Sequence, residues 1–170
     1  MALMRAFTRR ASVVWSGSHR HGTGTLTTES ALLKKAPYLL THHTNSAKGT
    51  SAPELIAAAH AGSFSISLAD ELGEAGYSPD QIDTTATVTM EDVAAEWTMT
   101  QIHLDVVASV PRMTQCDFID ATLRAKLSCP ISRLLNANIS MKAKLERRSI
   151  RLDAPRPKEP IKRARLRKDQ

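Results

Sequence analysis

Apolar and polar residues alternate along three long segments of the chain, as they do in a strand with one buried face. The segments are 82–90, 102–110 and 137–145. The sequence VAAE at 93–96 separates the first two, and a connection this short joins strands that run antiparallel. We therefore predict one long β-hairpin and a last, separate strand.

The N-terminal part of the chain predicts a second, shorter hairpin. Residues 11–15 and 24–28 have the composition of two short strands, and the stretch SGSHRHGTG that connects them contains glycine. Residues 41–49, THHTNSAKG, have no period and are rich in turn-forming side chains. We predict a surface loop there.

A helix should follow this loop. Ser51, Pro53 and Glu54 make an S-x-x-E capping box with proline in the first turn, and the helix is predicted to run to Leu72, before Gly73. Small or apolar residues recur on its helical period: Leu55, Ile56, Ala59, Gly62, Ser63, Ile66 and Ala69. Small side chains let another element approach closely, so we expect a central, fully packed helix.

A second helical period runs through 118–127 and is interrupted by Pro130, so this helix should end at Cys129. The predicted order is then strand, strand, helix, hairpin, helix, strand. This order indicates an α+β fold with an antiparallel sheet.

The chain has 170 residues, of which 42% are hydrophobic, and this is enough to bury one core. We place one domain at 11–146, between a disordered basic leader at 1–10 and a disordered basic tail at 147–170. Organelle import remains an alternative for the leader. No apolar run approaches the roughly 20 residues that a membrane span needs, so none is expected.

The positive charge is concentrated in the tail. Residues 147–170 hold ten Lys or Arg and three acidic residues, a net +7, so the chain's total of +6 leaves −1 for the remainder. Such a tail binds nucleic acid or an acidic membrane surface by counterion release, or it is a solvated extension, and these interpretations remain open. It has no aromatic residue, so any such binding should have little sequence preference.

Cys116 and Cys129 are the two cysteines, too few for a disulfide scaffold and not at metal-ligand spacing. A reducing cytoplasm is the expected compartment. Four histidines lie in predicted loops: His19, His21, His42 and His43. Because histidine pairs in loops are more often solvated than ligating, neither a metal nor a cofactor is expected.

Five blocks of the sequence together resemble the OsmC/Ohr family of thiol-dependent organic hydroperoxide peroxidases, in its OsmC subgroup. They are GTGTLTTES (22–30), KGTSAPELIAAAHAGSFSISLADELGEAGY (48–77), IDTTATVTM (82–90), WTMTQIHLDVVASVP (97–111) and AKLSCPISRLLNANIS (125–140). The resemblance covers residues 11–146. The pairing of ELIAAAHAGSFS with AKLSCPISRLL is its specific part.

The resemblance implies an intertwined homodimer in which a sheet from each chain wraps around two long helices. It also implies a reaction: a thiolate on the central helix attacks the O–O bond of an organic hydroperoxide and becomes a sulfenic acid. The cysteine of a CP motif then forms a disulfide, which a dithiol reductant reopens. An arginine lowers the pKa of the attacking thiol, and a glutamate holds that arginine.

Two cysteine positions of the family can be carried onto this sequence. Cys129, in CPISRLL, matches the resolving cysteine, but Ser63, in HAGSFS, stands where the attacking cysteine should be. A serine hydroxyl has a far higher pKa than a thiol and cannot cycle through a sulfenic acid. The resemblance therefore implies a peroxidase site whose turnover is lost or strongly reduced.

The two remaining positions also differ. The arginine position falls on His21, with Arg20 one place earlier, and the glutamate position falls on Pro53, with Glu54 one place later. A single engineered exchange at the cysteine position would leave the arginine and the glutamate in place. Their joint change favours a naturally altered site.

Alternatives to the peroxidase interpretation remain. His60 is the one evident base for Ser63 as a nucleophile, but no oxyanion donor accompanies it. Cys129 is either an inert core thiol or a lone redox sensor. At the level of the whole protein, the alternative is a non-catalytic dimer that binds an apolar ligand or a partner protein, with its basic tail on nucleic acid.

Overall fold

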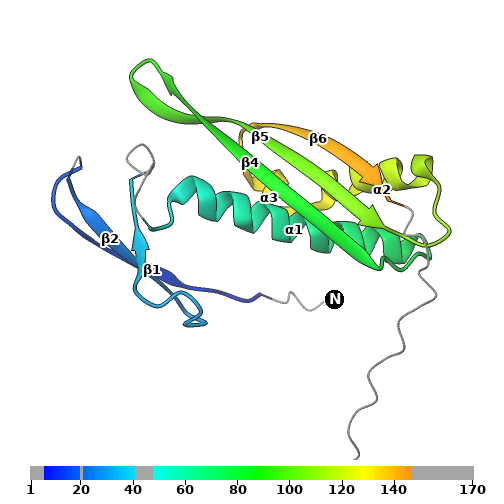
Figure 1. The fold of residues 1–170 in the computed structure, drawn as a ribbon, viewed down its shortest axis with the longest axis horizontal. Helices are drawn as coiled ribbons and strands as arrows, with labels where there is room; N and C mark the ends of the chain where they lie inside the picture. Colours follow the sequence, from blue (N-terminus) through cyan, green and yellow to red (C-terminus); the bar gives the residue numbers. More distant parts are fainter. Residues whose placement is uncertain (1–5, 20, 41–47, 147–170) are drawn as a thin grey trace, which may run out of the picture.

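The computed structural model describes residues 6–19, 21–40 and 48–146. They form two three-stranded sheets and three helices (Figure 1). The predicted α+β class is confirmed, but the strands form two separate sheets. The predicted tail at 147–170 lies outside the described residues, as do residues 1–5 of the predicted leader.

The first sheet is antiparallel, in the order β1 (Ala11–Ser16), β2 (Thr23–Thr28) and β3 (Ala36–Tyr38). The predicted N-terminal hairpin is confirmed by the β1–β2 register. Strand β3 was not predicted, because three residues are too few for an alternation to be recognised. Every residue of β1 is exposed, so this sheet has little cover within its own chain.

Helix α1 (Ala52–Glu74) begins where it was predicted, but the predicted capping box does not form. Ser51 is the N-cap residue and makes no side-chain cap hydrogen bond. Pro53 has no N–H group, which removes one of the two donors that a capping serine can accept from. The Glu54 carboxylate instead accepts a 3.0 Å hydrogen bond from the hydroxyl of Thr50.

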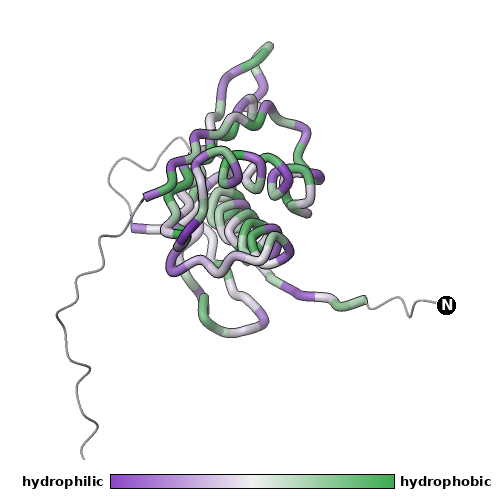
Figure 2. Tube along the Cα trace, turned by 90° about the vertical axis from the view of Figure 1, so that its right-hand side faces the viewer, coloured by the Kyte–Doolittle hydropathy of each residue, from purple (hydrophilic) through white to green (hydrophobic). Residues whose placement is uncertain are grey.

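The prediction that α1 is packed on all sides is wrong for the single chain. Its buried side chains are Pro53, His60, Phe64, Leu68 and Leu72. The small residues predicted to pack lie on the other side, which we call the open face of α1: Ala59, Gly62, Ile66 and Ala69. Ile66 is 74% exposed. Figure 2, which looks along α1, shows its turns mostly in white and green, so the open face is exposed without being strongly polar.

The second sheet has the order β4 (Gln81–Val93), β5 (Glu96–Ser109) and β6 (Asn138–Leu145). β4 and β5 form the predicted antiparallel hairpin, closed by a two-residue turn. β6 pairs with β5 in parallel, so the prediction of an antiparallel sheet is wrong for this strand. The chain between β5 and β6 passes through two helices. These helices return the chain to the end of the sheet at which β5 begins, as a parallel pairing requires.

These crossover helices are α2 (Gln115–Ser128) and α3 (Pro130–Leu134). Thr114 caps α2 through a 3.2 Å hydrogen bond from the N–H of Asp117. Cys129 ends α2 as predicted, and Pro130 starts α3, where its missing N–H costs nothing. The second sheet covers α1, with α2 and α3 beside it (Figure 1). The core lies between them: Phe64, Leu68, Leu72, Leu104, Val106, Phe118, Ala121 and Cys129 among others.

Candidate functional site

Ser63 and Cys129 lie in contact, although they are 66 residues apart. The Oγ of Ser63 is 3.3 Å from the Sγ of Cys129. Ser63 is half-buried in the middle of α1, and Cys129 is fully buried between α2 and α3. The pairing of these two positions, expected from the sequence resemblance, is therefore present in the fold.

Burial and nearby polar groups act in opposite directions on the thiol of Cys129. Burial raises the pKa of this thiol, because it disfavours the charged form. The hydrogen bonds act in the opposite direction: they come from the Ser63 hydroxyl and from both the N–H and the hydroxyl of Ser132, with a further one from the N–H of Ile131. Together they outweigh burial and leave the pKa of Cys129 below its ordinary value.

His60, three residues before Ser63 on α1, is fully buried. Its Nε2 is 2.8 Å from the Oγ of Ser132, and its Nδ1 has no hydrogen-bond partner among the described residues. Burial lowers the pKa of His60, which keeps the ring neutral. Since neither ring nitrogen is paired with Ser63, His60 does not serve as the base for a serine nucleophile among the described residues.

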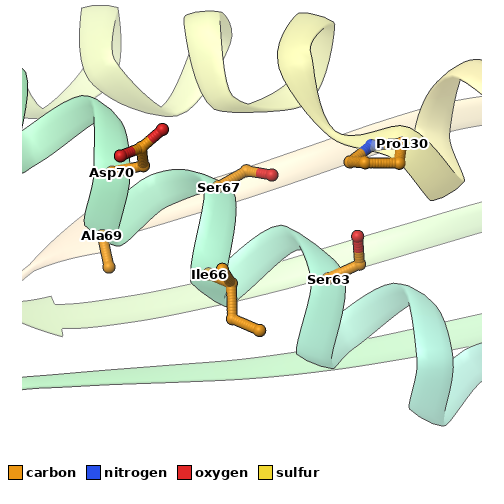
Figure 3. Close-up of a pocket in the computed structure, with 6 residues that line it drawn as sticks. All are labelled: Ser63, Ile66, Ser67, Ala69, Asp70 and Pro130. Atoms are coloured by element: carbon orange, nitrogen blue, oxygen red, sulfur yellow. The ribbon is translucent and has the colours of Figure 1, made fainter. Parts of the chain in front are cut away.

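A cavity of about 590 Å³ opens beside the pair. It is lined by Ser63, Ile66, Ser67, Ala69, Asp70 and Pro130. Figure 3 shows the Ser63 hydroxyl pointing toward Pro130, with Ser67 and Asp70 on the same side of α1. A molecule in this cavity meets Ser63 before it meets the buried sulfur of Cys129.

Glu54 lies elsewhere. It is nine residues from Ser63, which on a helix is about 14 Å along the axis and about half a turn around it. Glu54 lines a second cavity of about 460 Å³, between the start of α1 and β3. In the described chain it therefore does not share a cavity with Ser63.

Comparison with known proteins places this geometry in a family. Residues 43–144 match the family model of OsmC-like proteins, and this span contains both Ser63 and Cys129. The chain is also 38% identical over 138 residues to Peroxiredoxin OsmC of Escherichia coli K12, covering 81% of this chain and 96% of that protein. The chain belongs to the OsmC family.

Solved structures share the OsmC fold at low sequence identity. An OsmC-like protein of unknown function from Vibrio cholerae superposes with a TM-score of 0.67 at 13% identity, over 82% of this chain and 100% of that one. The organic hydroperoxide resistance protein OhrB of Bacillus subtilis gives 0.60 at 19% identity, over 81% and 98%. At these identities the likeness shows the fold alone.

The arginine position expected for the OsmC family falls in the connection between β1 and β2. His21 is exposed there, and its backbone N–H donates a 3.3 Å hydrogen bond to the hydroxyl of Ser18. Arg20 lies outside the described residues. The first sheet stands at the N-terminal end of α1 (Figure 1), and α1 packs against β4, β5, α2 and α3. The described chain does not bring His21 to its own Ser63.

Ser132 was not identified from the sequence. Its position three residues after Cys129, in the first turn that Pro130 begins, is the one feature that would have indicated it. It is in contact with His60, 72 residues away, and no local pattern connects the two.

Two further findings concern site types. No helix among the described residues is long and apolar enough to cross a membrane. In the same residues no three His, Cys, Asp or Glu side chains lie together as metal ligands would. His42 and His43, half of the histidine set considered from the sequence, lie outside the described residues.

Proposed function

We propose that this chain is a peroxiredoxin-like protein of the organic hydroperoxide and oxidative stress response whose site has lost, or nearly lost, thiol peroxidase turnover. The observation that supports this is the 3.3 Å contact between Ser63 and Cys129. A resolving thiol is held against the place of an attacking thiol, and that place holds a hydroxyl. The two free thiols fit a reducing cytoplasm.

The chemical reason for the loss is specific to sulfur. An attacking thiolate takes one oxygen atom from the hydroperoxide, the O–O bond breaks, and the alcohol leaves with a proton. The sulfenic acid then loses water as it forms a disulfide. Ser63 supplies neither the thiolate nor a partner for that disulfide, and Cys129 is itself buried.

We propose further that the protein is a homodimer. The open face of α1 and the fully exposed strand β1 are both apolar surfaces without cover in their own chain. Val14 of β1 is 68% exposed and Ile66 of α1 is 74% exposed. An intertwined partner would cover both surfaces and would bring its own β1–β2 connection, with His21, toward α1.

Stopped-flow consumption of cumene hydroperoxide with a dithiol reductant tests the proposed loss. We expect no catalytic turnover by the natural chain and measurable turnover by Ser63→Cys, because the new sulfur would lie against that of Cys129. Ser63→Cys should also form a disulfide when hydroperoxide is added, seen as the loss of two titratable thiols.

The matched controls are Ser63→Ala and Ser63→Cys combined with Cys129→Ser. The first should behave like the natural chain, and the second should react without forming the internal disulfide. Turnover by the natural chain that continues after many equivalents of hydroperoxide would show that peroxidase activity survives with Ser63 and would overturn the proposal.

A second candidate function is binding without catalysis. The cavity beside Ser63, at about 590 Å³, has the size of a small-molecule site and includes the side chain of Ile66. Cumyl alcohol, the unreactive product of cumene hydroperoxide, is a suitable probe for calorimetry. Binding by the natural chain that is lost in Ser67→Phe, which fills the cavity, would favour this function.

For the basic tail the proposed ligand is nucleic acid, with an affinity that falls steeply with salt.

A further inference from the structure

The polar residues that line the cavity beside Ser63 form a row along α1. They are Ser63, Ser67 and Asp70, spaced four and three residues apart, so successive members lie on the same side of the helix. Figure 3 shows Asp70 at the end of this row that is farthest from Ser63. The other lining residues are apolar: Ile66, Ala69 and Pro130. A ligand that lies along the row would therefore meet apolar surface, two hydroxyls and, at one end, a carboxylate.

The carboxylate of Asp70 has no partner of its own in the described part of the chain. It makes no hydrogen bond or ion pair there, and the same is true of the Ser67 hydroxyl. The next residue, Glu71, differs: it is paired with Arg124 at 3.0 Å and accepts a 3.1 Å hydrogen bond from the hydroxyl of Ser128. Arg124 is thus already matched by Glu71. Asp70 therefore presents an unmatched negative charge at the cavity, which attracts a cation and repels an anion.

We propose that this cavity takes small apolar molecules whose polar end is a cation, such as an amine, and disfavours carboxylates, with Asp70 as the residue that sets the preference. The ammonium group would donate to the Asp70 carboxylate and to the Ser67 hydroxyl, while the apolar part contacts the apolar lining. This ligand class rests on the proposed use of the cavity as a binding site, which it makes more specific.

The preference should be moderate in size. Asp70 is exposed, so water and salt screen its charge. For an exposed pair of opposite charges we expect an effect of roughly threefold on the affinity of a cation, and an effect of similar size and opposite sign on that of an anion. The two together give about a tenfold ratio between ligands that differ only in the sign of their charge, and this ratio should shrink at high salt.

The test is a titration of the full chain with three probes of one shape: cumyl alcohol, cumylamine and α,α-dimethylphenylacetate. At neutral pH they carry a hydroxyl, an ammonium and a carboxylate on the same apolar group. The backbone amide NMR signals of α1 give the affinities and show whether a probe lies beside Ser63 and Ser67. We expect Asp70→Asn to lower the ratio of amine to acid affinity roughly tenfold and to leave the alcohol within about twofold. Comparing the two proteins cancels the differences in hydration among the probes.

The matched control is Asp92→Asn, which removes the same charge from an exposed position of β4 that does not line the cavity. It should leave the ratio unchanged. An equal ratio in the natural chain and in Asp70→Asn would overturn the role of Asp70 while leaving binding by the cavity intact. If none of the three probes shifts the signals beside the cavity, both the ligand class and the binding function are wrong. None of the probes has an O–O bond, so the result is independent of whether peroxidase turnover has been lost.

Discussion

At the scale of single residues, the proposed loss of peroxidase turnover depends first on the oxygen atom that Ser63 carries. In the proposed function Ser63 presents oxygen at the position of the attacking sulfur, and its hydroxyl lies 3.3 Å from the sulfur of Cys129. Both residues could be identified from the sequence. The contact of Ser132 with His60 could not, because it joins residues that are 72 positions apart.

The burial of His60 predicts a pH dependence of stability. Its pKa is lowered from about 6.5 in the fold, so the unfolded chain binds a proton there that the folded chain does not. The free energy of unfolding should therefore fall as the pH drops below about 6.5, with a slope of at most about 1.4 kcal/mol per pH unit. Urea unfolding at a series of pH values measures this slope.

The control for this prediction is His60→Gln, which has no ionisable group at the same buried position. The two proteins are compared between pH 5.5 and 6.5, just below the ordinary histidine pKa of about 6.5. In this range the slope for His60→Gln should be clearly smaller than the slope for the natural chain. Equal slopes in the two proteins would mean that His60 is not the group responsible.

At the scale of elements, the β4–β5 hairpin is built on an unfavourable turn. Ala94 and Ala95 both have left-handed backbone angles, with φ of 54° and 67°. A two-residue turn of this kind favours Asn-Gly, because alanine's Cβ is crowded there. The alternation on either side is strong enough to predict the hairpin, and the pairing of two long strands offsets the cost of the turn.

Ala95→Gly should stabilise the protein by about 0.5–1 kcal/mol, since relief of the left-handed strain exceeds the added flexibility of the unfolded chain. The matched control is Ala75→Gly at the end of α1, where φ is −79° and glycine brings only flexibility. That change should destabilise by up to about 1 kcal/mol. Thermal unfolding compares the two, and destabilisation by both would contradict the role given to the turn.

At the scale of the whole molecule, two exposed apolar surfaces are the basis of the proposed dimer. The open face of α1 has room for one: a Cβ added at Gly62 would meet no atom within 4 Å in the single chain. A substitution there is therefore harmless to a monomer and disruptive to a dimer that packs α1 against its counterpart.

Gly62→Glu should halve the solution mass measured by light scattering, from a dimer of the 18.6 kDa chain to a monomer. In an isolated chain the change should even help, because glutamate is a better helix former than glycine by roughly 0.5–1 kcal/mol. Thr87→Glu adds the same charge at an exposed position of β4 and should leave the mass unchanged. A natural chain that is already monomeric would remove the basis of the dimer proposal.

Local patterns of the sequence determined much of this protein. Alternation indicated the β4–β5 hairpin and the last strand, and proline and the helical period indicated the ends of α1 and α2. The two positions of the site, in CPIS and HAGSFS, came instead from the resemblance to the OsmC family. The patterns of the strands and helices are local. These features depend on neighbours within a few residues. They can therefore be predicted without knowing the fold.

The tertiary structure alone decided which surfaces meet. Pairing of β6 parallel to β5 depends on where the helices return the chain, and the burial of the Phe64 and Leu68 side of α1 depends on which sheet covers it. The same holds for the contacts of Ser63 with Cys129 and of His60 with Ser132. Each joins residues distant in sequence, where many pairings satisfy the same local pattern and packing selects one.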